Sequence, residues 1–91
     1  MAAETDPALL AAFAERLVAL RKRTGFPQRK IAEYLGTTPQ LLSYWESGAS
    51  EPKFFQVVAL SRLYDVSLNV LAGLEPMPPP VPRPPTQRRG N

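Results

Sequence analysis

The sequence predicts an all-α fold, a single domain built from five short helices. Apolar residues recur at the three- and four-residue spacing of an amphipathic helix through residues 7–74. The alternation of apolar and polar residues that is typical of strands does not occur in the sequence. Glycines interrupt the periodic stretches where a helix would end in the left-handed conformation, at Gly25, Gly36, Gly48 and Gly73.

The first helix is expected to begin at Pro7 and to end near Arg23. Asp6 is a good N-cap, and proline suits the first helical position because its missing N–H would have no partner there. The apolar side chains of this helix follow one face, at Leu10, Phe13, Leu17 and Leu20. Residues 1–6 are expected to form a short lead into the domain.

Residues 28–45 are predicted to contain two short helices joined by a tight turn. Gly36 ends the first of them, because only glycine enters the left-handed region without steric cost. Thr38 offers an N-cap hydroxyl, and Pro39 opens the second helix. The apolar residues expected to face the core are Ile31, Ala32, Leu35, Leu42 and Trp45.

Two further helices complete the prediction. The fourth, residues 54–64, is expected to be largely buried because it carries Phe54, Val57, Val58, Leu60, Leu63 and Tyr64. Asp65 is a tolerable residue for a left-handed exit from this helix. Ser67 then caps a short fifth helix, which contains Leu68, Val70 and Leu71 and ends at Gly73.

The composition excludes several classes of function. The chain has 91 residues and no Cys or His, so it lacks the commonest metal ligands and the commonest general base. We therefore expect no enzyme, cofactor or metal. No apolar run approaches the roughly 20 residues that span a bilayer, and the N-terminus has no secretory pattern, so we expect a cytoplasmic protein. The net charge of +3 permits nucleic-acid binding without demonstrating it.

Residues 75–91 differ in composition from the rest of the chain, because they are rich in proline and almost free of large apolar side chains. Such a segment cannot form a packed core and is expected to be extended or disordered, with polyproline II character. The spacing of Pro79, Pro82 and Pro85 also fits ligands of SH3-type domains, although any proline-rich tail matches it by chance. A tail is the default interpretation, and a segment that binds a protein partner is the alternative.

From about Phe13 to Leu74 the chain resembles the phage-repressor, Cro-like (XRE) family of helix-turn-helix DNA-binding domains. The positions in register with that family are an Arg-rich end of the first helix, Gln28, Ala32, Leu35, Gly36, Thr38, Leu42, Glu46, Gly48, Pro52 and the turn Asp65–Leu68. The resemblance implies a lambda-repressor-like five-helix bundle whose third helix enters the DNA major groove. It implies a sequence-specific regulator of transcription that binds double-stranded DNA, of the repressor type, in a bacterium or phage.

The resemblance also implies which residues contact DNA. Gln28 is expected to donate a hydrogen bond to a DNA phosphate, and Lys53 is expected to lie near the minor groove. Ser50 and the backbone of its loop are expected to contact phosphates. The groove-facing positions of the third helix are Thr38, Pro39, Gln40, Leu41, Ser43 and Tyr44. Helical geometry independently places Gln40 and Tyr44 opposite the buried side. Glutamine can pair with adenine, and leucine can contact a thymine methyl group. The alternative for Leu41 is packing on its own helical turn.

Two residues implied by the resemblance have structural roles. Arg21 and Glu46 are expected to form a partly buried ion pair that ties the first helix to the end of the third. The sequence departs from the family pattern at three positions. Pro27 removes a helix cap, and Pro39 removes a polar side chain from the groove-facing side of the third helix. Glu51 adds a negative charge to a loop. We therefore expect modest base readout, with DNA shape and phosphate contacts supplying much of the affinity.

The main alternative function is a protein-interaction module, such as an antitoxin or an accessory regulator, that uses the same fold to bind a protein. The charge around the third helix separates the two classes. Exposed Arg29, Lys30 and Lys53 favour DNA, whereas a rim dominated by Glu33 and Glu51 favours a protein partner.

A weak homodimer is also expected, because one small domain contacts too little DNA for tight specific binding. The fifth helix and its exit supply more apolar side chains than one face of a short helix buries, namely Leu68, Val70, Leu71 and Leu74. The arginines of the tail, Arg83, Arg88 and Arg89, are expected to add nonspecific attraction to DNA.

Overall fold

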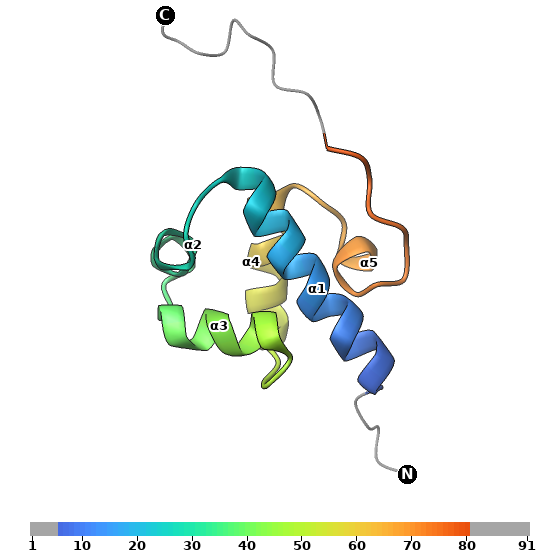
Figure 1. The fold of residues 1–91 in the computed structure, drawn as a ribbon, viewed down its shortest axis with the longest axis horizontal. Coiled ribbons are helices and arrows are strands. Elements are labelled where there is room, and N and C mark those ends of the chain that lie inside the picture. The colour runs from blue at the N-terminus through green and yellow to red at the C-terminus, as the bar shows by residue number, and fades with distance from the viewer. Residues whose placement is uncertain (1–5, 81–91) are drawn as a thin grey trace, which may run out of the picture.

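The computed structural model describes residues 6–80, and this part of the chain consists of five helices and no strand. The helices are α1 (Pro7–Thr24), α2 (Gln28–Leu35), α3 (Pro39–Ser47), α4 (Phe54–Tyr64) and α5 (Leu68–Leu71). In Figure 1, α1 crosses the front of the bundle and α4 lies behind it. Helices α2 and α3 lie on one side of α1, and α5 lies on the other. The all-α prediction and the five helices are confirmed.

The helix ends follow from the residues that the sequence places there. The Asp6 carboxylate accepts a hydrogen bond from the Ala8 N–H at 2.9 Å, and Thr38 Oγ1 accepts from the Leu41 N–H at 3.1 Å. Ser67 Oγ accepts from the Val70 N–H at 3.1 Å. These side chains satisfy N–H groups that have no partner within their own helix. Pro27 precedes α2 without a side-chain cap, as the departure from the family pattern predicts.

The tight turn between α2 and α3 rests on Gly36, whose φ of 72° lies in the left-handed region. Its conformation lets the Thr37 N–H reach back to the Ala32 carbonyl oxygen at 2.9 Å. Asp65 makes the corresponding exit from α4 with φ 56°, and it is the only residue with positive φ other than glycine among residues 6–80. Both turns occur where the sequence predicts them.

The core lies where the five helices meet. Its largest fully buried side chains are Trp45, Leu17, Ile31, Leu42, Leu60 and Leu71. The prediction that Leu42 and Trp45 face inward is therefore confirmed, and Trp45 is a core residue.

Two predictions about apolar residues are wrong. The fourth helix is not largely buried, because Phe54 and Phe55 at its start are 63% and 78% exposed. The surface predicted for dimerisation is smaller than expected, since Val70 and Leu71 are buried inside the single chain. The helical spacing of apolar residues shows which side chains share a face of a helix. How many of those side chains are buried depends on which other elements pack against that helix.

The segment of residues 75–80 leaves α5 as an extended strap along the body of the domain. Arg16 holds its start, donating from one guanidinium nitrogen to the Val70 carbonyl oxygen at 2.6 Å and to the Glu75 carbonyl oxygen. Met77 packs against the core. The predictions for Pro82, Pro85 and the tail arginines Arg83, Arg88 and Arg89 lie outside the described residues.

Candidate nucleic-acid interface

The two sides of α3 differ sharply in burial. Leu42 and Trp45 are 0% and 1% exposed and fix the helix against α1 and α2. On the opposite side Gln40 and Tyr44 are exposed, and Leu41 and Ser43 are half-buried. Thr38 and Pro39, which open the helix, are exposed as well. The structure therefore presents a solvent-facing surface along the positions predicted to face the DNA groove.

A buried carboxylate holds α3 from behind. Glu46 is 9% exposed, and its two oxygens accept from Arg21 Nε at 2.7 Å and from Arg21 Nη2 at 3.0 Å. This bidentate geometry fixes both partners more strongly than a single contact would. The hydrogen bond to Glu46 raises the pKa of the Arg21 guanidinium above its ordinary value. The predicted ion pair between the first and third helices is confirmed.

Gln28 joins the same cluster, which sequence reasoning missed. Its Nε2 donates to Glu46 Oε1 at 2.8 Å, so the first residue of α2 is linked directly to the last turn of α3. An amide nitrogen carries two hydrogens, and the second remains available to a phosphate oxygen. The sequence gives no signal for the contact between Gln28 and Glu46, because the two residues lie in different helices.

The exposed side of α3 contains its own hydrogen bond. Gln40 Nε2 donates to the Tyr44 phenol oxygen at 2.7 Å, across one helical turn. The bond leaves the Tyr44 O–H and the Gln40 carbonyl oxygen free to meet a ligand. It also orders two side chains that would otherwise lose rotamer freedom when they bind.

The loop between α3 and α4 folds back on the end of α3. The N–H groups of Ala49 and Ser50 both donate to the Tyr44 carbonyl oxygen, at 2.9 and 3.3 Å. The hydroxyl oxygen of Ser50 is buried and has no hydrogen-bond partner among residues 6–80. It faces the interior, so the prediction that this hydroxyl meets phosphates is wrong. Lys53, the N-cap residue of α4, is exposed.

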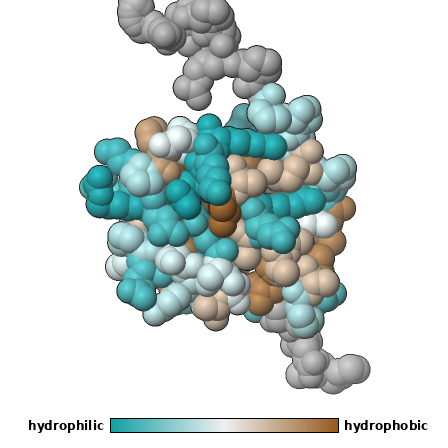
Figure 2. Space-filling view, viewed as in Figure 1, coloured by the Kyte–Doolittle hydropathy of each residue, from teal (hydrophilic) through white to brown (hydrophobic). Residues whose placement is uncertain are grey.

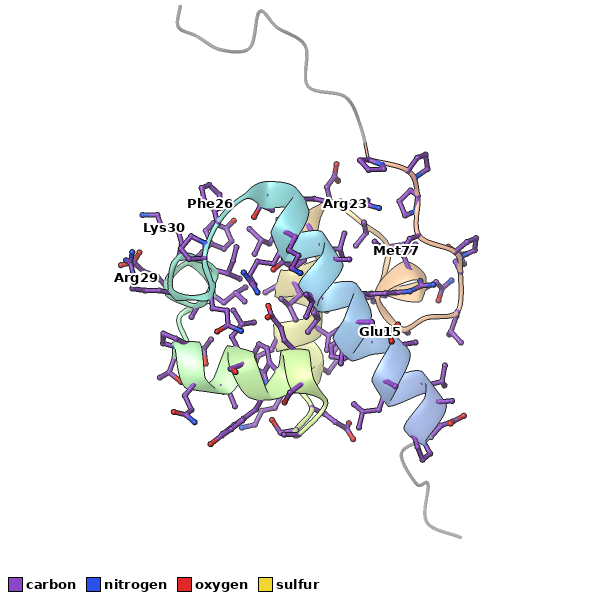
Figure 3. The ribbon with its side chains drawn as sticks, in the orientation of Figure 1. Glu15, Arg23, Phe26, Arg29, Lys30 and Met77 are labelled. Carbon is purple, nitrogen blue, oxygen red and sulfur yellow. The ribbon has the colours of Figure 1, made fainter. Side chains whose placement is uncertain are left out.

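The charged rim contains both signs. Arg29, Lys30 and Lys53 are exposed, and so are Glu33 and Glu51. Lys30 and Glu33 lie 3.8 Å apart, an exposed contact of little energetic weight. Figure 3 shows Arg29 and Lys30 pointing away from α2 into solvent. Cations are thus available at the start of α2 and at the start of α4, although the rim is not uniformly basic.

Other kinds of site find no support in residues 6–80. This part of the chain has no group of three or more side chains that could hold a metal ion. None of its helices is long and apolar enough to cross a membrane.

Two short helices, α2 and α3, joined by a tight glycine turn, with one side of α3 buried and the other facing solvent, form a helix-turn-helix. The family model described as helix-turn-helix matches residues 17–71, more than half of the chain. The chain belongs to this XRE-type helix-turn-helix family. The resemblance found in the sequence is confirmed.

Several proteins of this family are similar to the chain. The uncharacterized HTH-type transcriptional regulator YobD of Bacillus subtilis (strain 168) is 32% identical over 68 residues, which are 75% of this chain and 61% of the relative. The SPbeta prophage-derived uncharacterized HTH-type transcriptional regulator YonR of the same organism is 36% identical over 59 residues, or 65% of this chain and 55% of the relative. The chain thus spans less than two thirds of each relative's length.

A solved structure with a similar fold is that of the P22 c2 repressor protein in complex with synthetic operator 9T. The match has a TM-score of 0.66 and 27% sequence identity, and it covers 69% of this chain and 96% of the repressor chain. The described fold is therefore that of a phage repressor domain.

Proposed function

We propose that this chain is a regulator of transcription, of the repressor type, that binds double-stranded DNA and reads its major groove with α3. The observation that carries the proposal is the solvent-facing polar side of α3, held from behind by Trp45 and by the Glu46 cluster. A recognition helix must be rigid to place side chains against base edges. The P22 c2 repressor, which shares the fold, forms a complex with a synthetic operator.

Each residue of the proposed interface has a role that suits its chemistry. Gln40 pairs with an adenine edge, and Leu41 contacts a thymine methyl group. Tyr44 donates its hydroxyl hydrogen to a base or a phosphate. Gln28 and Lys53 contact phosphates and position the domain without reading sequence. Thr38, Pro39 and Ser43 complete the surface that approaches the groove.

The proposed interface has few donors for base edges. Pro39 and Leu41 supply none, so Gln40 and Tyr44 carry the direct readout. We therefore expect sequence-dependent DNA shape and phosphate contacts to supply a large part of the affinity. An enzymatic role is not proposed, and a regulator of this kind acts where the DNA is, in the cytoplasm of a bacterial cell.

A weak homodimer would align two recognition helices with successive major grooves, about 34 Å apart. Leu68 and Leu74 are 39% and 63% exposed, and Leu9, which lies against Gly73, is 39% exposed. Figure 2 shows hydrophobic residues gathered on the side of α1 and α5, while the side of α2 and α3 is mainly hydrophilic. We propose that these three leucines form the dimer contact, in place of the buried Val70 and Leu71.

The dimer is tested by sedimentation at high micromolar concentration, with Leu74→Glu as the disrupting variant and Leu74→Met as its apolar control. We expect reversible association that Leu74→Glu removes and Leu74→Met keeps. Association that Leu74→Glu leaves unchanged would place the contact elsewhere.

The DNA-binding function is tested by enriching genomic fragments on the immobilised chain and sequencing them. We expect a recurrent short motif that a footprint then localises, and we expect its enrichment to disappear with Gln40→Ala and Tyr44→Ala combined. Fragments without a common motif, enriched equally by the wild-type chain and the double variant, would remove α3 from DNA recognition.

A further inference from the structure

An apolar hollow of about 250 Å³ opens between the first half of α1 and the first turn of α4. The loop before α4 and the end of α5 complete its wall. Its volume is below the roughly 300–1,000 Å³ of a small-molecule site, so it suits one large side chain. Glu51 is part of the wall and is exposed. The apolar lining residues are Leu9, Leu10, Phe13, Pro52, Val57 and Ala72. We name this feature the α1–α4 hollow.

Two exposed phenylalanines stand at the edge of the α1–α4 hollow, at the start of α4. Phe54 and Phe55 are 63% and 78% exposed, and their rings pack edge to face with the centroids 5.0 Å apart. Phe54 lies three residues before Val57, so the two side chains share one face of α4. Val57 belongs to the wall of the hollow and Phe54 does not. Phe54 therefore projects beside the hollow without filling it.

A projecting aromatic ring and a hollow on one face make that face complementary to a second copy of itself. In a contact with two-fold symmetry both copies present the same surface, so every contact between two residues is made twice, once in each direction. Aromatic side chains that fill a pocket on the partner are frequent anchors of protein interfaces. One ring and one hollow per chain therefore provide two identical contacts.

The exposed apolar area also fits a second copy. An aromatic side chain buries roughly 150–250 Å², so the exposed parts of Phe54 and Phe55 amount to roughly 250 Å² per chain and about 500 Å² for a pair. That is a large share of the roughly 1,200 Å² at which stable specific interfaces begin. Leu9, one of the three leucines of the proposed dimer contact, also lines the hollow, so the two surfaces are continuous.

We propose that Phe54 of each chain inserts its ring into the α1–α4 hollow of a second copy, so that two chains associate reciprocally about a two-fold axis. Phe55 holds the Phe54 ring from the side, which limits the rotamer freedom that binding removes. The inference rests on the weak homodimer of the proposed function, and it names the side chain and the hollow that anchor that dimer.

Sedimentation of the full chain at high micromolar concentration measures the contribution of the ring. Phe54→Ala should weaken self-association about tenfold or more, because it removes the anchor and leaves the partner's hollow empty. Tyr34→Ala removes an exposed aromatic side chain from α2, outside this face, and should associate like the wild-type chain. Both positions are exposed, so both variants should keep the wild-type Tm, which excludes unfolding as the cause.

An equal mixture of ¹³C-labelled and unlabelled chains shows where the ring binds. Isotope-filtered NMR detects only contacts between different chains in such a mixture. We expect NOEs from the Phe54 ring protons of one copy to the methyl groups of Leu10, Val57 and Ala72 of the other copy. Their intensity should fall on dilution in parallel with the dimer fraction.

Three results would overturn the proposal. If Phe54→Ala associates like the wild-type chain while Leu74→Glu does not associate, the leucine contact stands and the anchor is wrong. NOEs between Phe54 and Leu10 that arise only within one chain would mean that the ring occupies its own hollow. A wild-type chain that stays monomeric at every concentration would remove both the anchor and the dimer, whereas the operator test of DNA binding is independent of this result.

Discussion

The inner and outer sides of α3 are subject to different physical constraints. Leu42, Trp45 and Glu46 on the inner side are buried, and each has its position fixed by packing or by charge-assisted hydrogen bonds. Gln40 and Tyr44 on the outer side are exposed, and their side chains hydrogen-bond to each other. Stability therefore depends on the inner side, whereas the outer side is free to serve recognition. Substitutions on the two sides should separate folding from DNA binding.

The largest expected effect is the loss of stability on truncating the inner side. Trp45→Ala removes the largest fully buried side chain and leaves a cavity between α1 and α3, which costs about 3–5 kcal/mol. A domain of this size has a total stability of roughly 5–15 kcal/mol, so the variant should be close to unfolding. Urea denaturation followed by circular dichroism measures the change.

The matched substitution on the outer side is Tyr44→Ala. An exposed side chain away from the core should change the free energy of unfolding by about 0.5 kcal/mol or less. Equal losses for the two variants would show that the outer side of α3 also packs against the fold.

The second prediction concerns the Glu46 cluster. Glu46→Ala strands the Arg21 guanidinium, whose side chain is only 18% exposed, and removes the partner of Gln28. We expect a loss of roughly 3 kcal/mol in the free energy of unfolding. Glu33→Ala, which breaks the exposed pair with Lys30, is the control and should cost well under about 1 kcal/mol.

A double variant sharpens this test. Arg21→Met combined with Glu46→Leu removes both charges and should recover much of the lost stability. If the double variant is as unstable as Glu46→Ala, the cost arises from lost packing and not from an unpaired charge.

Lys53 provides a test of the phosphate contacts at the edge of the outer side. Lys53→Ala should weaken binding to specific and random DNA alike and reduce the salt slope of log Kd by about one unit. Lys22→Ala removes an exposed cation from α1, outside the proposed interface, and serves as the control. A salt titration in which both variants keep the wild-type slope would exclude Lys53 from the interface.

The smallest effect expected concerns Tyr64, whose ring lies in the core near Glu46. Burial raises the pKa of the Tyr64 phenol above its usual value, and the Glu46 carboxylate raises it further while Arg21 opposes the shift. The folded chain therefore keeps this proton at a pH where the unfolded chain, with a tyrosine pKa of 10.0, releases it. The resulting stability is present below the unfolded-state pKa and is lost as the pH rises above it.

Tyr64→Phe should remove that loss. The Tyr64 hydroxyl has no hydrogen-bond partner among residues 6–80, so the variant should cost little at neutral pH. As the pH rises from about 9 to 11, the free energy of unfolding of the wild-type chain should decrease by about 1 kcal/mol more than that of Tyr64→Phe. Thermal melts across this range measure the difference, with Tyr34→Phe at an exposed position as the control. Parallel curves for Tyr64→Phe and wild type would mean that the phenol ionises in the folded chain.

The same contrast explains what the sequence could predict. Helix ends depend on neighbouring residues, so Asp6, Thr38, Ser67 and the left-handed exit at Asp65 were predictable from local rules. The inner side of α3 was predictable because its apolar residues follow the helical period. The pair of Arg21 and Glu46 was found through resemblance to known repressors, since no local rule joins residues in different helices.

The predictions that failed or were missed concern burial and contacts that depend on how the helices pack together. Phe54 was expected to be buried with the fourth helix, but it lies at the exposed start of α4. The hydrogen bond from Gln28 to Glu46 was not predicted, and it leaves the expected phosphate contact of Gln28 a prediction. The anchoring of the strap by Arg16 joins residues far apart in the sequence and had no sequence signal. The candidate DNA-contacting residues themselves remain predictions, because exposure shows only that they are available.

The central claim is that the outer side of α3 recognises DNA and contributes nothing to folding. The most direct measurement is the Kd of Gln40→Ala and Tyr44→Ala for the selected operator by gel shift, at a temperature where both variants are fully folded. We predict that each substitution weakens operator binding by about 1–3 kcal/mol while the Tm stays within about a degree or two of wild type. Wild-type Kd values for both variants would contradict the claim.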